Sequence, residues 1–139
     1  MQLTRFTDYG LRTLMFVVAR PQSNASVKEI AEHYNISRNH LVKVVHRLAQ
    51  LGYIETTKGK GGGLKIAENT QNMRLGDLIT HLEPNMNMVE CFDAKTNTCR
   101  ITNTCQLKHY LYEATQNFIT TMNKYTLADM TQNQMMMLK

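Results

Sequence analysis

The sequence predicts a mainly α-helical protein with one small β-hairpin and one long helix near its C-terminus. Apolar residues recur at helical spacing in several separate stretches, which is typical of amphipathic helices. Two short alternating stretches flank a glycine-rich segment, which is typical of a hairpin. Because 42% of the 139 residues are apolar, the chain can also bury a core.

Composition excludes several classes of protein. No run of about 18 apolar residues is present, so no membrane span is expected. The N-terminal residues lack the apolar region and the cleavage site of a secretory signal, so we expect a cytoplasmic protein. The three cysteines are an odd number, which makes a poor disulfide framework.

Positive charge is concentrated in the first half of the chain. Residues 1–66 hold ten Lys/Arg and four Asp/Glu, whereas residues 67–139 hold six and seven, so the halves carry net charges of +6 and −1. A basic segment of this kind indicates either a polyanionic partner or a solvated basic face.

Two short helices are predicted at the start of the chain. The first covers residues 7–19, with Thr7 or Asp8 as its N-cap. Ser26 and Glu29 have the spacing of a capping box, which opens the second helix.

A third helix and a hairpin follow. Ser37 is expected to cap the helix, and Gly52 to end it as the C′ residue. Residues 53–57 and 64–66 then read as two strands, joined by a basic glycine turn at 58–63. The apolar stripe predicted for the third helix consists of Leu41, Val44, Val45, Leu48 and Leu51.

The second half contains a short helix, a loop and a long helix. A polar linker at 69–72 precedes a helix at 75–83, which Pro84 stops. Residues 85–104 show little periodicity, and a long helix then covers about 106–125. Its apolar residues form a coiled-coil-like seam of Leu107, Leu111, Ala114, Phe118, Met122 and Tyr125.

Helix, short helix, tight turn, helix and basic hairpin is the order of a winged helix-turn-helix domain. The third helix offers Arg and Lys for guanine, Asn for adenine, and a serine near its start for a phosphate. Lysines at the glycine wing suit phosphate contacts or a minor groove. The candidate DNA-binding residues are Ser37, Arg38, Asn39, His40, Lys43, Lys58 and Lys60.

These elements suggest three parts. Residues 1–83 form the predicted winged DNA-binding domain, and residues 84–105 form a cysteine-rich loop. Residues 106–139 form a dimerisation helix and tail, because the apolar seam needs a second copy. A dimer of winged domains fits the two half-sites of a palindromic operator in double-stranded DNA.

Sulfur is concentrated in the cysteine-rich loop. Cys91, Cys99 and Cys105 lie within 15 residues, which favours a metal or redox site over scattered small hydrophobic residues. Thiolates suit zinc or an iron–sulfur cluster, but the spacing is not that of a zinc ribbon. Because no fourth cysteine exists, a carboxylate, a histidine or an exogenous group has to complete a four-ligand site.

Several runs of residues resemble those of the iron–sulfur winged-helix repressors, over essentially the whole chain. Within that family they are more similar to the nitric-oxide-sensing NsrR branch than to the IscR branch, whose histidine ligand corresponds to Lys108 here. The runs are FTDYGLR (6–12), ISRNHLVKV (36–44), LGYI (51–54), GKGGGL (59–64), the cysteine loop and YTLADM (125–130).

The resemblance implies a homodimeric repressor with one 4Fe–4S or 2Fe–2S cluster per subunit. It makes Cys91, Cys99 and Cys105 the cluster ligands and offers Asp8 of the partner subunit as the fourth. It also implies that DNA affinity falls when nitric oxide destroys the cluster.

Other functions stay open at this point. A winged-helix regulator could instead sense iron–sulfur status, zinc or thiol oxidation. A small electron-transfer or cluster-carrier protein would have no use for a basic wing. Catalysis is not expected, because Ser37, His40 and Asp8 make no plausible triad.

Overall fold

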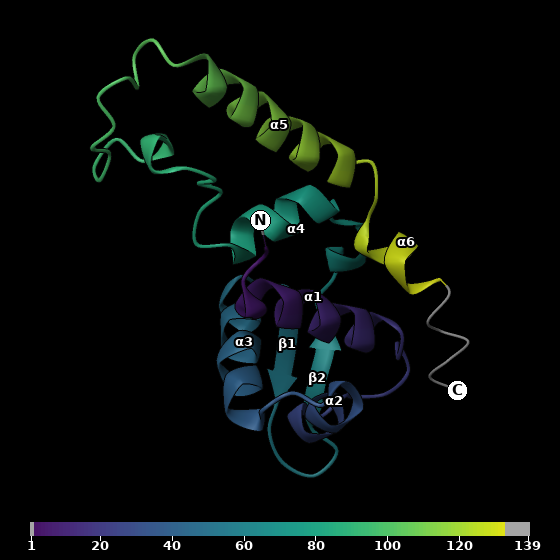
Figure 1. Ribbon diagram of the computed structural model, residues 1–139. Helices are drawn as coiled ribbons and strands as arrows, with labels where there is room; N and C mark the ends of the chain where they lie inside the picture. The colour runs from purple at the N-terminus through teal and green to yellow at the C-terminus, as the bar shows by residue number, and fades with distance from the viewer. Residues whose placement is uncertain (1, 133–139) are drawn as a thin grey trace.

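The computed structural model describes residues 2–132. Residues 133–139 of the predicted 106–139 segment therefore lie outside the described residues. A body of helices and one hairpin forms one end of the molecule, while the cysteine loop and α5 extend away from it (Figure 1). The elements in chain order are α1 (Arg5–Val18), α2 (Val27–Tyr34), α3 (Arg38–Gln50), β1 (Ile54–Thr57), β2 (Gly63–Ile66), η1 (Thr70–Asn72), α4 (Leu75–Leu82), η2 (Glu90–Phe92), α5 (Gln106–Met122) and α6 (Leu127–Thr131).

The first helix begins earlier than its sequence predicts. Thr4 is the N-cap, and its hydroxyl oxygen accepts a hydrogen bond from the backbone N–H of Thr7 at 3.3 Å. The prediction that Thr7 or Asp8 is the N-cap is therefore wrong, because both residues already lie inside α1. Thr7 is instead fully buried, which its polar side chain did not suggest.

The tight turn between α2 and α3 follows from local chemistry. Ser26 and Glu29 form the predicted capping box, with reciprocal bonds of 3.1 and 2.8 Å. The hydrogen bonds from Ser26 lower the pKa of Glu29. Asn35 ends α2 in the left-handed region at φ 52°, a conformation that Asn tolerates better than most residues. Ser37 is the residue before α3 as expected, but its side chain makes no capping hydrogen bond.

Helix α3 packs against α1, α2 and β1 through the predicted stripe. Leu41, Val44, Val45 and Leu48 are buried, and Leu51 is half-buried just beyond the helix. Gly52 follows at φ 75°, so the predicted C′ glycine is confirmed.

The two strands form the predicted antiparallel hairpin. Ile54 pairs with Ile66 and Thr57 with Gly63, and residues 58–62 form the turn. Tyr53, just before β1, and Leu64 in β2 are 6% and 4% exposed, so both belong to the core.

The chain returns to the winged body after α5, which the sequence did not predict. The long helix ends at Met122 rather than at Tyr125, and α6 follows after a turn. Leu127 of α6 is fully buried in the same apolar cluster as Leu14 and Leu41. Residues 127–131 therefore add to the core of the predicted segment 1–83.

Helix α5 is attached to the body mainly through its C-terminal end. Asn123 accepts a hydrogen bond from the backbone N–H of Asp77 and donates one to the Asp77 carboxyl group, both at 3.0 Å. Gly76 permits this approach, because a Cβ atom there would lie 2.6 Å from the carbonyl oxygen of Ile119. The predicted linker at 69–72 is the 3-10 turn η1, in which Thr70 is buried. No helix within residues 2–132 is long and apolar enough to cross a membrane.

We expect Leu127→Ala to lower the free energy of unfolding by about 2–5 kcal/mol, since it leaves a cavity in the shared core. Urea denaturation at fixed protein concentration measures the change. Val42→Ala, at a half-exposed position on α3, is the control and should stay within about 0.5 kcal/mol of the parent. Equal stability of the Leu127 variant and the parent would contradict the core role of α6.

Candidate nucleic-acid interface and cysteine loop

One end of the body carries the predicted DNA-binding residues. The start of α3 and the hairpin turn both lie toward the lower end of the molecule in Figure 1. All seven candidate side chains are exposed, because the buried stripe of α3 faces α1 and the hairpin. The residues that this end presents are Ser37, Arg38, Asn39, His40 and Lys43 on α3, and Lys58 and Lys60 on the turn.

The wing is held against the body by residues before α2. Ala25 and Leu64 exchange two backbone hydrogen bonds of 3.0 and 2.7 Å, which adds a bridge to the hairpin. Asn24 donates from Nδ2 to the carbonyl oxygen of Gly61 at 2.6 Å, close to the tip. The sequence-based prediction assigned Asn24 no role at the wing. The two wing lysines are thus displayed on an anchored turn.

A hydrogen bond joins the base of the wing to α4. The Tyr53 hydroxyl contacts Nδ1 of His81. Burial raises the pKa of Tyr53, and Asp77 raises it further while Arg47 lowers it. The phenol therefore stays protonated at neutral pH, and it shares this hydrogen bond with the imidazole nitrogen.

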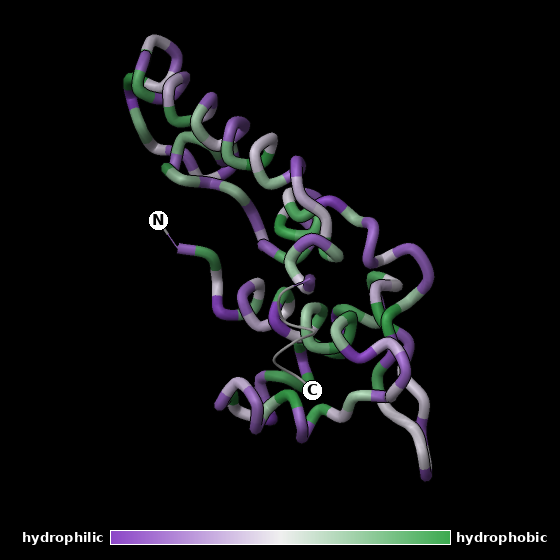
Figure 2. The backbone as a smooth tube through the Cα atoms, turned by 90° about the vertical axis from the view of Figure 1, so that its right-hand side faces the viewer, coloured by the Kyte–Doolittle hydropathy of each residue, from purple (hydrophilic) through white to green (hydrophobic). Residues whose placement is uncertain are grey.

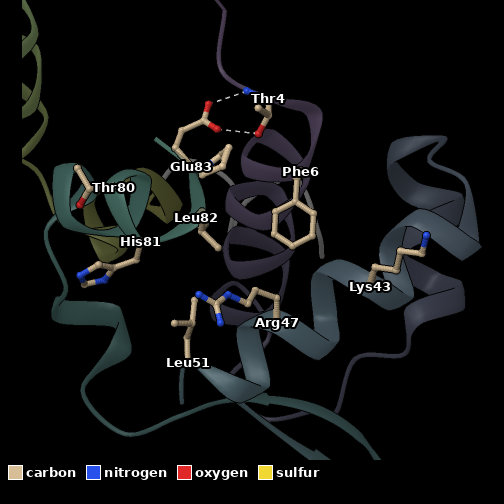
Figure 3. Close-up of a pocket in the computed structure, with 10 residues that line it drawn as sticks. Thr4, Phe6, Lys43, Arg47, Leu51, Thr80, His81, Leu82 and Glu83 are labelled. Carbon is tan, nitrogen blue, oxygen red and sulfur yellow. Dashed lines mark hydrogen bonds between the residues drawn. The ribbon is translucent and has the colours of Figure 1, made fainter. Parts of the chain in front are cut away.

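An open cavity of about 780 Å3 lies between the start of α1, one side of α3 and the end of α4 (Figure 3). Arg47 from α3 and Phe6 from α1 line it, and both have no role in the sequence-based prediction. Glu83 lies at its edge beside Thr4, where Figure 3 draws their hydrogen bonds.

Glu83 fastens the start of α1 to the start of the cysteine loop. Its carboxyl oxygens accept hydrogen bonds from Thr4 N and Thr4 Oγ1, both at 2.7 Å, and from Thr7 Oγ1 at 3.0 Å. The residue is 9% exposed, so these bonds replace most of its solvation. Pro84 holds Glu83 in an extended conformation, with ψ 136°, which turns the chain out of α4. We call this group the Glu83 clasp.

The cysteine loop is organised by its own polar side chains. Asp93 accepts from the backbone N–H of Lys95 at 2.9 Å, and Asn97 accepts from that of Cys99 at 3.0 Å. Thr115 of α5 donates to the sulfur of Met88 at 2.9 Å, which holds the loop's first part against α5.

The three cysteines are free and half-exposed. Cys91 lies in η2, Cys99 in the loop, and Cys105 directly before α5. Within residues 2–132, no three His, Cys, Asp or Glu side chains are placed close enough to hold a metal ion. As a donor set, three unpaired thiols on one loop fit a thiolate-bound cluster.

Asp8 stands apart from the cysteines and has a partner on its own helix. Its two carboxyl oxygens contact Nε and a terminal nitrogen of Arg12 at 2.9 and 2.8 Å. Arg12 also lies over the ring of Tyr34, 5.9 Å from its centroid. Both side chains of the ion pair are 42% exposed, so solvent and other groups can reach the Asp8 carboxylate.

The helical order, the anchored wing and the basic end define a winged helix-turn-helix protein of the transcription-regulator class. The family model of the Rrf2 iron-dependent transcriptional regulators matches residues 3–133. The chain belongs to the Rrf2 family.

Similar proteins agree with this assignment. The chain is 46% identical to the HTH-type transcriptional regulator NsrR of Bacillus subtilis, over 96% of this chain and 92% of that protein. It is 42% identical to NsrR of Shouchella clausii, over 96% and 91%. These relatives confirm the predicted resemblance, and they are transcriptional regulators rather than enzymes.

Solved structures confirm the winged-helix fold. CymR of Bacillus subtilis, described as the global cysteine regulator, has a TM-score of 0.74 at 20% identity and covers 96% of this chain and 98% of its own. IscR of T. potens has a TM-score of 0.76 at 19% identity, with 96% and 88% covered.

We expect Glu83→Gln to lower the free energy of unfolding by about 1–3 kcal/mol. The amide nitrogen it introduces cannot accept a hydrogen bond, so a donor of Thr4 or Thr7 loses its partner. Urea denaturation gives the difference, with Glu68→Gln as the control at an exposed site. If the two variants are equally stable, the clasp does not hold α1 in place.

Proposed function

We propose that the chain is a homodimeric repressor of palindromic operators whose DNA affinity is controlled by an iron–sulfur cluster and nitric oxide. The observation that carries this proposal is the attachment of a loop with three free thiols, through the Glu83 clasp, to the first helix of a winged domain. The NsrR name of the relatives supports it.

DNA recognition rests on the exposed residues at the start of α3. Arg38, Asn39, His40 and Lys43 have the side-chain types that read base edges in the major groove. Ser37 lies at the helix N-terminus, where a phosphate is favoured. Lys58 and Lys60 bind the phosphate backbone or a minor groove beside it.

The surface of α5 supports a dimer. Of the residues of α5, Thr115 alone is buried within this chain. Hydrophobic and hydrophilic residues alternate along α5 as it extends from the body (Figure 2). Leu107 and Tyr110 are 61% and 63% exposed. A second copy of α5 covers such a surface without loss of contacts inside either chain.

Cys91, Cys99 and Cys105 hold one cluster per subunit, either 4Fe–4S or 2Fe–2S. Asp8 of the partner subunit is the fourth ligand in this proposal. When bound, the cluster supplies iron that reacts with nitric oxide. In the structure the Asp8 carboxylate is bound by Arg12 in an ion pair with 42% of each side chain exposed, and such pairs are worth about 0–1 kcal/mol. Arg12 therefore releases this carboxylate at small cost.

The Glu83 clasp couples the loop to the DNA-binding end. A change in the conformation of the loop displaces Pro84 and Glu83. The hydrogen bonds of Glu83 to Thr4 and Thr7 transmit this displacement to the start of α1. Helix α1 packs directly against α3. Because the two helices share one core, a shift of α1 moves α3 with it and changes the spacing between the α3 helices of the two subunits. About 3 kcal/mol of differential affinity between the two arrangements would release DNA about 100-fold more readily.

The same three free thiols favour one second candidate. A winged-helix regulator of the same fold could sense zinc, thiol oxidation or iron–sulfur status through them. Metal analysis and the absorption spectrum of anaerobic protein separate these inputs. An electron-transfer or cluster-carrier protein would produce no operator footprint.

We expect Arg38→Ala to weaken binding to the selected DNA on the order of 10- to 100-fold, because a guanidinium that reads a base contributes about 1–3 kcal/mol. The probe is a duplex selected by the parent protein from a random pool, and gel shifts give the affinity. Arg74→Ala removes the same charge from an exposed residue outside α3 and the wing, and should retain binding. An equal fall for random duplexes would make Arg38 a phosphate contact instead.

We expect Cys99→Ala to abolish the visible absorption of anaerobically purified protein, since two thiols of one subunit hold a cluster poorly. Iron and sulfide analysis checks the loss independently of DNA binding. In the parent, nitric oxide titration should bleach the spectrum and release the selected duplex together.

Thr98→Ala, next to Cys99 on the same loop, is the matched control and should keep iron, spectrum and response. A full cluster spectrum and tight, nitric-oxide-sensitive DNA binding in Cys99→Ala would reject this mechanism.

A further inference from the structure

One exposed side chain of α3 does not match its surroundings. Val42 is 50% exposed. The other large hydrophobic side chains that are exposed within residues 2–132 lie between residues 88 and 125, in the cysteine loop, on α5 or just after it. Among the residues that the structure describes, Val42 is thus the one large apolar side chain of the winged body that is exposed.

Val42 lies on the same face of α3 as the predicted base-reading residues. Asn39 is three positions before it and His46 four positions after, spacings that place side chains on one side of a helix. All three are exposed, whereas Leu41 and Val44, which face the core, are buried.

The neighbours of Val42 favour a polyanion as the occupant of this face rather than an apolar protein surface. Exposed polar or cationic side chains surround it, and the hairpin turn lies toward the same end of the molecule as the start of α3 (Figure 1). An apolar partner would leave these groups buried without hydrogen-bond acceptors, which is costly. A major groove offers acceptors for them and one apolar group as well.

That apolar group is the C5 methyl of thymine. We propose that Val42 is a specificity-determining residue, which selects thymine over cytosine by packing its side chain against this methyl group. Valine has no hydrogen-bonding group, so the methyl is the feature of the pyrimidine edge that it can read. In a helix the β-branched side chain is held mainly in one rotamer, which places its own methyl groups reproducibly.

This inference rests on the proposed DNA binding and adds a base preference to it. Asn39, on the same face, can pair bidentately with adenine. The two side chains together predict an A·T-containing step within each half-site. Neither residue is part of the apolar core, so both are available for recognition without cost to the fold.

The test uses the full chain, purified anaerobically, and a duplex that it selects from a random pool. Each thymine of the duplex is replaced in turn by deoxyuridine, which removes the C5 methyl and nothing else. For the parent, we expect one thymine in each half-site at which replacement weakens binding about three- to fivefold, the ratio provided by one buried methyl group.

Val42→Ala should lower this sensitivity clearly, because the single methyl group of alanine covers less of the thymine methyl than the two methyl groups of valine. Gln50→Ala, at another exposed position of α3, should keep the parent's sensitivity. Circular dichroism and gel filtration confirm that each variant folds as the parent does, which is expected because Val42 is half-exposed.

Three results overturn the inference. The first is a parent protein whose binding is unchanged by every deoxyuridine replacement, and the second is a Val42→Ala variant that keeps the full sensitivity. In both of these cases, selection of a duplex still supports DNA binding itself. If the parent selects no duplex from the pool, the proposed function fails and this inference fails with it.

Discussion

The arrangement of this protein depends on one buried carboxyl group. Glu83 sits where α4 ends and the cysteine loop begins, yet its hydrogen bonds go to Thr4 and Thr7 at the start of the chain. A carboxyl group that is 9% exposed has to keep such partners, because burial without them is costly. The bonds therefore bring the first helix and the loop to one junction. Asp8, which forms the ion pair with Arg12, is the residue directly after Thr7 in the sequence.

The end that carries the predicted DNA-binding residues is held together by a different feature, which is one core shared by many short elements. Helix α3 is fixed on its buried side by α1, α2 and β1. Asn24 and Ala25 hold the wing, and Leu127 of α6 closes the core from the far end of the chain. A reading face on such a support keeps its side chains in place before DNA arrives, so little ordering has to follow binding.

The cysteine loop contrasts with this body. Many of its hydrogen bonds are short-range, such as those of Asp93 and Asn97 to residues two positions further on, and its thiols are half-exposed. A sensor needs a segment whose arrangement can change, whereas a base-reading helix needs one that does not change. The proposed function assigns these two requirements to neighbouring parts of the chain, which the Glu83 clasp connects.

Local chemistry was enough to predict most of the winged domain from the sequence. The capping box at Ser26, the stripe of α3 and the glycine turn of the wing depend on residues a few positions apart, so their periodicity and spacing reveal them. The positions of Thr4, Glu83 and Leu127 were decided by tertiary structure. Each acts through partners far away in the chain, and a polar or apolar residue alone does not reveal such a partner. Likewise, the sequence identified three thiols as a possible site, but the placement of Cys91 in η2 and of Cys105 directly before α5 follows from how the loop folds.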